Sequence, residues 1–139
     1  RALGAGSGIV AILIGTLITI SVQSSSITTS VLVPLAASGV LTLENIYPVT
    51  LGANVGTTVT ALLASLATGS PAAVTVALVH TLFNISGILA FYPLSSLRKI
   101  PIRMANKLSG IAAERRSLAL VYTLTVFIVI PLLGVLVLR

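Results

Sequence analysis

The sequence predicts an all-α integral membrane protein, and three features of the chain support this fold class. Hydrophobic residues make up 56% of the 139 residues, whereas charged residues make up only 7%. A soluble domain carries about 25% charged residues to cover its surface. Asp, Glu, Lys and Arg are absent from residues 2–43, 45–97 and 117–138, and the basic residues gather between these stretches. A lipid bilayer suits this pattern, so we expect a single membrane domain over residues 1–139.

Residues 9–38 are predicted to form a re-entrant helical hairpin. Two apolar runs, residues 9–22 and 27–40, flank the polar sequence Gln-Ser-Ser-Ser at 23–26. As a helix, the first run would reach about 21 Å, which is short of the ~30 Å hydrocarbon core. The alternative is one long tilted span, but its centre would be polar. We therefore prefer a hairpin with residues 23–26 at its tip.

Residues 45–68 are long enough to span a bilayer, but we expect this helix to be broken. The sequence Gly-Ala-Asn-Val-Gly-Thr-Thr at 52–58 places two glycines around an asparagine, which favours an unwound stretch. Unwound backbone at membrane depth is tolerated where it lines a cavity. The alternative is that Gly52 and Gly56, four residues apart, allow close packing of a continuous helix.

Two complete transmembrane helices are predicted at residues 72–92 and 117–138, with any kink in the second at Pro131. Between them, residues 95–113 alternate basic and apolar side chains at helical spacing. This pattern predicts an amphipathic helix that lies on the membrane surface.

The basic segment, residues 98–116, carries +5 of the formal net charge of +6. A short basic loop between apolar spans is typical of the cytoplasmic side, so we expect the amphipathic helix to be cytoplasmic and the hairpin to open towards the cytoplasm. A nucleic-acid partner is not expected, because the segment contains no aromatic residue on which a base could stack. The partner of these helices is the lipid bilayer.

The two predicted interruptions suit the binding of ions. A helix N-terminus attracts anions, and Ser and Thr hydroxyls donate hydrogen bonds to oxyanions. We expect such ends after Ser26 and after Gly56. Unwound carbonyls, together with the side-chain oxygens of Gln23, Asn54 and Thr57, would supply ligands to an alkali cation. This combination is typical of secondary transporters; the alternative is that the hydroxyls bond back to their own helices.

Two motifs identify a resemblance to a known family. The sequence Gln-Ser-Ser-Ser-Ile-Thr-Thr-Ser at 23–30, followed by Tyr-Pro-Val-Thr-Leu-Gly-Ala-Asn-Val-Gly-Thr-Thr at 47–58, closely resembles the type II sodium-dependent phosphate cotransporters. The match is most similar to bacterial members and to the second of the family's two inverted repeats. It extends through Ile-Pro-Ile-Arg-Met-Ala at 100–105, and so covers nearly the whole chain.

The resemblance implies sodium-coupled symport of inorganic phosphate by alternating access across the plasma (inner) membrane. It implies no enzyme activity and no cofactor other than sodium as the coupling ion. The phosphate-binding positions carried over are Ser24, Ser25 and Ser26. The sodium-binding positions carried over are Gln23, Ser24, Thr57 and Thr60, with Asn54 as a weaker candidate.

A complete transport site also requires a partner. The family's other repeat is absent from these residues, so we expect the missing half or a second chain to supply it. The chain begins at Arg1 without Met, and we interpret it as a fragment of a longer protein. Cysteine is absent, which removes thiolate metal sites and leaves sodium as the expected metal ion.

Other functions remain open as alternatives. The chain could serve a symporter of another small anion, a channel or a structural membrane module. An intramembrane hydrolase that pairs Ser25 with His80 is disfavoured, because it lacks an acid within the membrane and the glycines of a nucleophile elbow. His80 and Asn84 lie four residues apart, so we expect them to share a helix face from which they could hydrogen-bond to a neighbouring helix. We interpret His80 as a neutral packing residue, and the alternative is a proton-relay or ligand role.

Overall fold

The prediction of an all-α fold is confirmed. The computed structural model describes residues 5–138, and they are helical apart from short connections. They form two compact units, the first ending at Arg98 and the second beginning at Lys99. Three helical stretches are long and apolar enough to cross a membrane: Leu43–Ala67, Pro71–Phe91 and Arg116–Val137. Their bounds lie close to those expected from the sequence.

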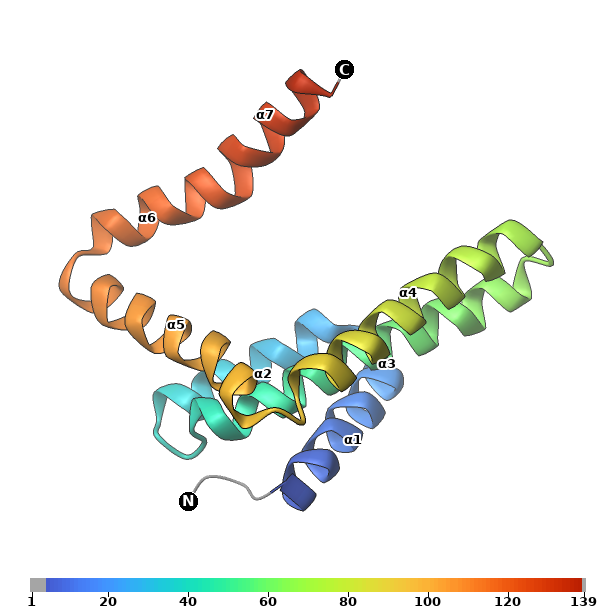
Figure 1. Cartoon of the computed structure of the whole chain (residues 1–139), viewed down its shortest axis with the longest axis horizontal. Helices are drawn as coiled ribbons and strands as arrows, with labels where there is room; N and C mark the ends of the chain where they lie inside the picture. Colours follow the sequence, from blue (N-terminus) through green and yellow to red (C-terminus); the bar gives the residue numbers. More distant parts are fainter. Residues whose placement is uncertain (1–4, 139) are drawn as a thin grey trace. The chain divides into compact units, whose positions relative to one another are not determined.

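Two short helices begin the first unit. Helix α1 (Ala5–Val22) and helix α2 (Ser25–Ala37) are separated by Gln23 and Ser24, where the chain turns sharply (Figure 1). Gln23 has φ of 56°, and within residues 5–138 it is the one non-glycine residue with positive φ. Ser24 is extended and caps α2. The turn therefore lies at the predicted tip, while the re-entrant placement of the hairpin in a membrane remains a prediction.

Helix α3 (Leu43–Ala67) corrects one expectation. The predicted break at residues 52–58 is absent, because α3 is a single α-helix of 25 residues. The hydroxyls of Thr57 and Thr58 bond back to carbonyls of α3, at Ala53 and Val55, and so they do not cap a new half-helix. A glycine in a helix costs about 1 kcal/mol relative to alanine. Contacts with α1 account for the glycines instead.

The packing of α1 against α3 depends on closely approaching backbones. A Cβ atom added to Gly52 would clash with the carbonyl oxygen of Ile12, and one added to Gly15 would clash with that of Val49. Thr16 Oγ1 donates to the carbonyl oxygen of Gly52 across this interface at 3.0 Å. Such close approach increases van der Waals contact where no hydrophobic force drives helices together. The alternative interpretation of the glycine pair is therefore correct.

Helix α4 (Pro71–Phe91) runs back along α3 after a tight turn, with Ser70 as its N-cap (Figure 1). Tyr92, directly after α4, is buried and its ring lies 6.5 Å from that of Tyr47 in α3. The Arg98 guanidinium lies 5.1 Å from the centroid of the Tyr92 ring, within the range of a cation–π interaction. These contacts fix the last residues of the first unit to α3.

The second unit contains most of helix α5 (Ser95–Glu114) and the final apolar stretch. In α5 the basic residues Arg103 and Lys107 are exposed, and so are Met104 and Ile111 of the expected apolar face. The placement of this helix on a membrane surface remains a prediction. The final stretch is α6 (Arg116–Leu124), a π-helical segment (Thr125–Val129) and α7 (Ile130–Val137).

The π-helical segment ends two residues before Pro131, the residue at which we expected any kink in this helix. Ile130 N donates to the carbonyl oxygen of Thr125, five residues earlier, whereas a regular α-helix uses the fourth. Pro131 has no N–H and its ring crowds the preceding turn, so the helix widens there instead of breaking. The departure from a regular α-helix therefore begins at Thr125, and the ring of Pro131 is its cause.

Candidate functional site

The candidate site lies where the tip between α1 and α2 meets α3. A pocket of about 480 Å³ at this place is lined by one residue from α1, the tip and one face of α3. The lining residues are Ile20, Gln23, Thr57, Thr60, Ala61, Leu63 and Ala64. The structure thus brings together three of the residues that the sequence indicates as sodium ligands, from positions more than 30 residues apart.

The hydroxyls of Thr57 and Thr60 are oriented by α3 itself. Thr57 Oγ1 donates to the carbonyl oxygen of Ala53 at 3.1 Å, and Thr60 Oγ1 donates to that of Thr57 at 2.8 Å. Because each hydroxyl has one proton, both oxygens keep their lone pairs for another partner. These hydroxyls do bond back to their own helix, as the alternative interpretation held, but their oxygens can still coordinate a cation.

The tip provides the opposite chemistry, since it offers hydrogen-bond donors. Ser24 Oγ accepts from Ile27 N at 3.3 Å and so caps α2. Among the described residues, no hydrogen bond is formed by the side chains of Gln23, Ser25 or Ser26. Ser25 and Ser26 begin α2, where unpaired N–H groups and the helix dipole favour an anion. Hydroxyl and backbone donors thus converge at the start of one helix.

Only one of the two predicted anion-binding helix ends is found within residues 5–138. The start of α2 matches the expectation after Ser26, but no helix begins after Gly56, because α3 is continuous there. The backbone of residues 52–58 is likewise helical and not unwound, so its carbonyl groups are not the cation ligands that we expected. The oxygens available to a cation in the pocket come from side chains.

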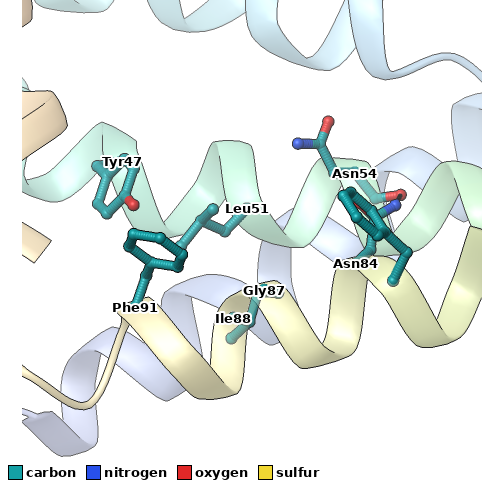
Figure 2. Close-up of a pocket in the computed structure, with 8 residues that line it drawn as sticks. Tyr47, Leu51, Asn54, Asn84, Gly87, Ile88 and Phe91 are labelled. Carbon is teal, nitrogen blue, oxygen red and sulfur yellow. Dashed lines mark hydrogen bonds between the residues drawn. The ribbon is translucent and has the colours of Figure 1, made fainter. Parts of the chain in front are cut away.

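Asn54 lies in a different pocket from the other sodium candidates. A pocket of about 200 Å³ between α3 and α4 is lined by residues of both helices, including Tyr47, Asn54 and Asn84 (Figure 2). Asn84 Nδ2 donates to the backbone carbonyl oxygen of Asn54 at 3.4 Å. This bond confirms the expectation that Asn84 bonds to a neighbouring helix. The structure does not bring Asn54 together with Gln23.

His80 forms no hydrogen bond to a neighbouring helix within the described residues, so this part of the expectation is not met. It is exposed and lines another pocket with Ser65 and Ala77, and Ser25 is not part of that lining. The side chain of Ser25 therefore has no partner among the described residues that could act as a general base.

Sequence reasoning missed two threonines next to the tip. Thr19 of α1 and Thr28 of α2 are buried, and their hydroxyl oxygens lie 2.9 Å apart. A single Thr in an apolar helix ordinarily bonds to its own backbone, so the sequence carries no signal that these two meet. They join the two helices one turn away from the tip.

Comparison with known proteins identifies the family. The model of the Na+/Pi-cotransporter family matches residues 4–112. The chain is 50% identical over 129 residues to the human sodium-dependent phosphate transport protein 2B, covering 91% of this chain and 19% of that protein. It is 48% identical over 131 residues to protein 2C of Mus musculus, covering 91% of this chain and 21% of that protein.

The matched region includes the tip and the whole of α3. The chain spans about a fifth of the length of these relatives. No solved structure matches it. Since the family model covers most of the residues, and the tip and α3 motifs lie within it, the chain belongs to the Na+/Pi-cotransporter family.

Proposed function

We propose that this chain forms one inverted-repeat half of a sodium-coupled phosphate symporter of the plasma membrane. In this proposal the serines Ser24, Ser25 and Ser26 bind phosphate at the start of α2. Sodium binds in the adjacent pocket through Gln23, Ser24, Thr57 and Thr60. The other half of the site comes from the second repeat or from another chain. The relatives' names, which specify sodium-dependent phosphate transport, support this choice over another anion.

The observation that carries the proposal is the juxtaposition of the pocket and the tip. Gln23 lines the pocket, and the following three residues are the serines that begin α2. Oxygens with free lone pairs suit a cation, and free hydroxyl donors suit an oxyanion. The two ions would therefore bind next to each other, and each would reduce the electrostatic cost of binding the other.

The absence of basic residues strengthens this coupling. Residues 2–97 contain neither Lys nor Arg, and His80 lines a different pocket, so these helices place no basic side chain beside the tip. A helix N-terminus supplies only about half a positive charge. In this proposal sodium supplies further positive charge, which would couple the binding of the two ions electrostatically. A channel is not favoured, because this coupling needs both ions to be bound in one occluded site.

Sodium activation of phosphate uptake tests the proposal. In cells that produce this chain together with the other half of the transporter, uptake should depend on sodium and saturate with phosphate. Gln23→Ala and Thr57→Val each remove one oxygen from the pocket, so the sodium concentration for half-maximal uptake should rise on the order of 10-fold.

Thr81→Val is the matched control. Thr81 is also half-buried and donates to the carbonyl four residues earlier, but it lies in α4 outside this pocket. Uptake by this variant should follow the parent curve. Unchanged sodium activation in Gln23→Ala and Thr57→Val, with normal amounts of protein in the membrane, would contradict the sodium assignment.

A further inference from the structure

The buried threonine pair next to the tip has a defined hydrogen-bond direction. Thr28 Oγ1 lies 3.1 Å from the Ser24 carbonyl oxygen, to which it donates. Its single proton is thus used, so in the 2.9 Å contact between the two hydroxyls Thr19 must donate to Thr28. The chain of bonds runs from Thr19 through Thr28 to the carbonyl of Ser24.

Thr19 differs from the threonines of the neighbouring helical turns in how it uses its hydroxyl. Thr16 and Thr57 both donate to a carbonyl of their own helix. Thr19 has no such bond among the described residues, and its hydroxyl contacts only that of Thr28. With Thr19 fully buried and Thr28 4% exposed, water cannot replace this bond. Its loss leaves a buried polar group unpaired.

Thr19 is also held from the side of α3. A Cβ atom added to Gly56 would lie 2.7 Å from Cβ of Thr19, so the two helices touch at this point without space for a methyl group. Gly56 directly precedes Thr57, which lines the pocket with Gln23. The threonine relay, Thr19–Thr28–Ser24, therefore connects the start of α2 to the part of α3 that carries the pocket.

We infer that Thr19 and Thr28 are positioning residues that fix the serine tip relative to the Thr57 face of α3. Neither hydroxyl contacts the transported ions, because both are buried between the helices. Their effect acts through the Ser24 carbonyl, which Thr28 also bonds through its backbone N–H at 3.2 Å. This inference rests on the proposed function, because that function assigns ion binding to the tip. The hydrogen bonds of the relay do not depend on it.

Valine substitutions test the relay, because valine has the shape of threonine without the hydroxyl. Thr19→Val and Thr28→Val should each raise the phosphate concentration for half-maximal uptake about 2- to 12-fold, the range of one hydrogen bond. The maximal rate per protein molecule at the surface should change less. The double variant should be no worse than the worse single variant, because both remove the same relay. Thr19→Ser, which keeps the hydroxyl, should behave like the parent.

Thr75→Val is the control, since Thr75 is exposed on α4 and bonds only to its own helix. Hydrogen exchange of the Ile27 and Thr28 amides, which both bond to Ser24, provides a readout in the purified protein that does not depend on transport. Exchange should be faster in Thr19→Val and Thr28→Val and unchanged in Thr75→Val.

The two readouts separate the relay from the proposed function. Absence of sodium-dependent phosphate uptake in the parent would contradict the proposed function, and the exchange measurement would still decide on the relay. Reduced surface amount or maximal rate, with half-saturation and tip exchange unchanged, would mean that the pair only packs α1 against α2. That outcome overturns the inference.

Discussion

The hydroxyl groups near the candidate site differ in whether their protons are already bonded to a backbone carbonyl. Thr57 and Thr60 direct their protons into α3 and keep oxygen lone pairs towards the pocket. Ser25 and Ser26 have no such bond among the described residues and so keep their protons available. The same functional group can therefore serve a cation in one place and an anion a few residues away. Side-chain type alone would not distinguish these roles.

Gln23 lies between the two proposed ion positions and has an unfavourable backbone conformation. Its φ of 56° lies in the left-handed region, which costs a non-glycine residue roughly 1–3 kcal/mol. Glycine would relieve this cost but would remove a side chain that lines the pocket. Retaining glutamine here is consistent with a function for the side chain, as the proposed sodium site requires.

At the residue scale, Ser25→Ala should weaken phosphate binding without destabilising α2. Ser25 is the first residue of α2, and alanine is a strong helix former. The substitution removes one donor to a buried oxyanion, which costs about 1–3 kcal/mol, or roughly 5- to 150-fold in affinity. Phosphate affinity should be measured at several sodium concentrations, because sodium and phosphate must tighten each other by the same factor.

Ser38→Ala is the matched control for Ser25→Ala. Ser38 follows the other end of α2 and bonds to the carbonyl of Leu35, so its substitution should leave phosphate affinity close to that of the parent. Equal effects of the two substitutions, or a phosphate affinity that is indifferent to sodium, would remove the serine tip from the proposed site.

At the scale of elements, the glycines of α3 determine how closely the tip approaches the pocket. Gly52 and Gly56 lie one helical turn apart and face α1 at Ile12, Thr16 and Thr19. At this interface Thr16 donates to the backbone carbonyl of Gly52, and Thr19 lies within hydrogen-bond distance of Thr28. The glycine motif therefore serves the site by permitting contact and leaves the helix unbroken.

Gly52→Ala should destabilise the protein, because its Cβ would clash with the backbone of α1 at Ile12, and backbone cannot move aside as a side chain can. Overpacking of this kind typically costs 1–3 kcal/mol. Gly87→Ala in α4 is the control: no atom lies within 4 Å of the added Cβ, so helix propensity alone should make it neutral or stabilising by up to about 1 kcal/mol. Thermal unfolding in detergent compares the two, and equal stabilities would contradict the close α1–α3 interface.

The sequence predicted the existence and approximate ends of the helices, because each apolar run is bounded by polar or turn-forming residues. The sequence could not decide whether Gly52 and Gly56 break the helix or allow close packing. That choice depends on contacts with α1, where Thr16, which bonds to Gly52, lies 36 residues earlier in the chain. The sequence also did not indicate the Thr19–Thr28 bond. Tertiary contacts between short elements leave no periodic pattern in the chain.

At the scale of the whole molecule, both proposed ion positions lie within this chain, which spans only about a fifth of its relatives. Phosphate has four oxygens, and one helix N-terminus with three serines faces only part of such an ion. A second repeat in inverted orientation would present its own tip from the opposite side of the membrane. Alternating access would then consist of one repeat moving against the other.

The topology of the chain in the membrane decides from which side this tip enters. The basic segment 98–116 carries +5 of the net charge, which predicts that α5 lies in the cytoplasm and the loop before α4 lies outside. The 139 residues contain no cysteine, so single cysteines can serve as probes. Lys107 is exposed on α5, and Ala72 is exposed in the first turn of α4. Ser70 is unsuitable as a probe position because it caps α4.

Lys107→Cys should be modified by a membrane-impermeant thiol reagent only after the cytoplasmic face is made accessible, whereas Ala72→Cys should be modified in intact cells. The parent, treated in the same way, gives the background. With this result α3 runs from the cytoplasm outwards, and α1 and α2 enter from the cytoplasmic side. The opposite labelling would show that the basic segment does not set the orientation, and the serine tip would then have to receive phosphate from the other side.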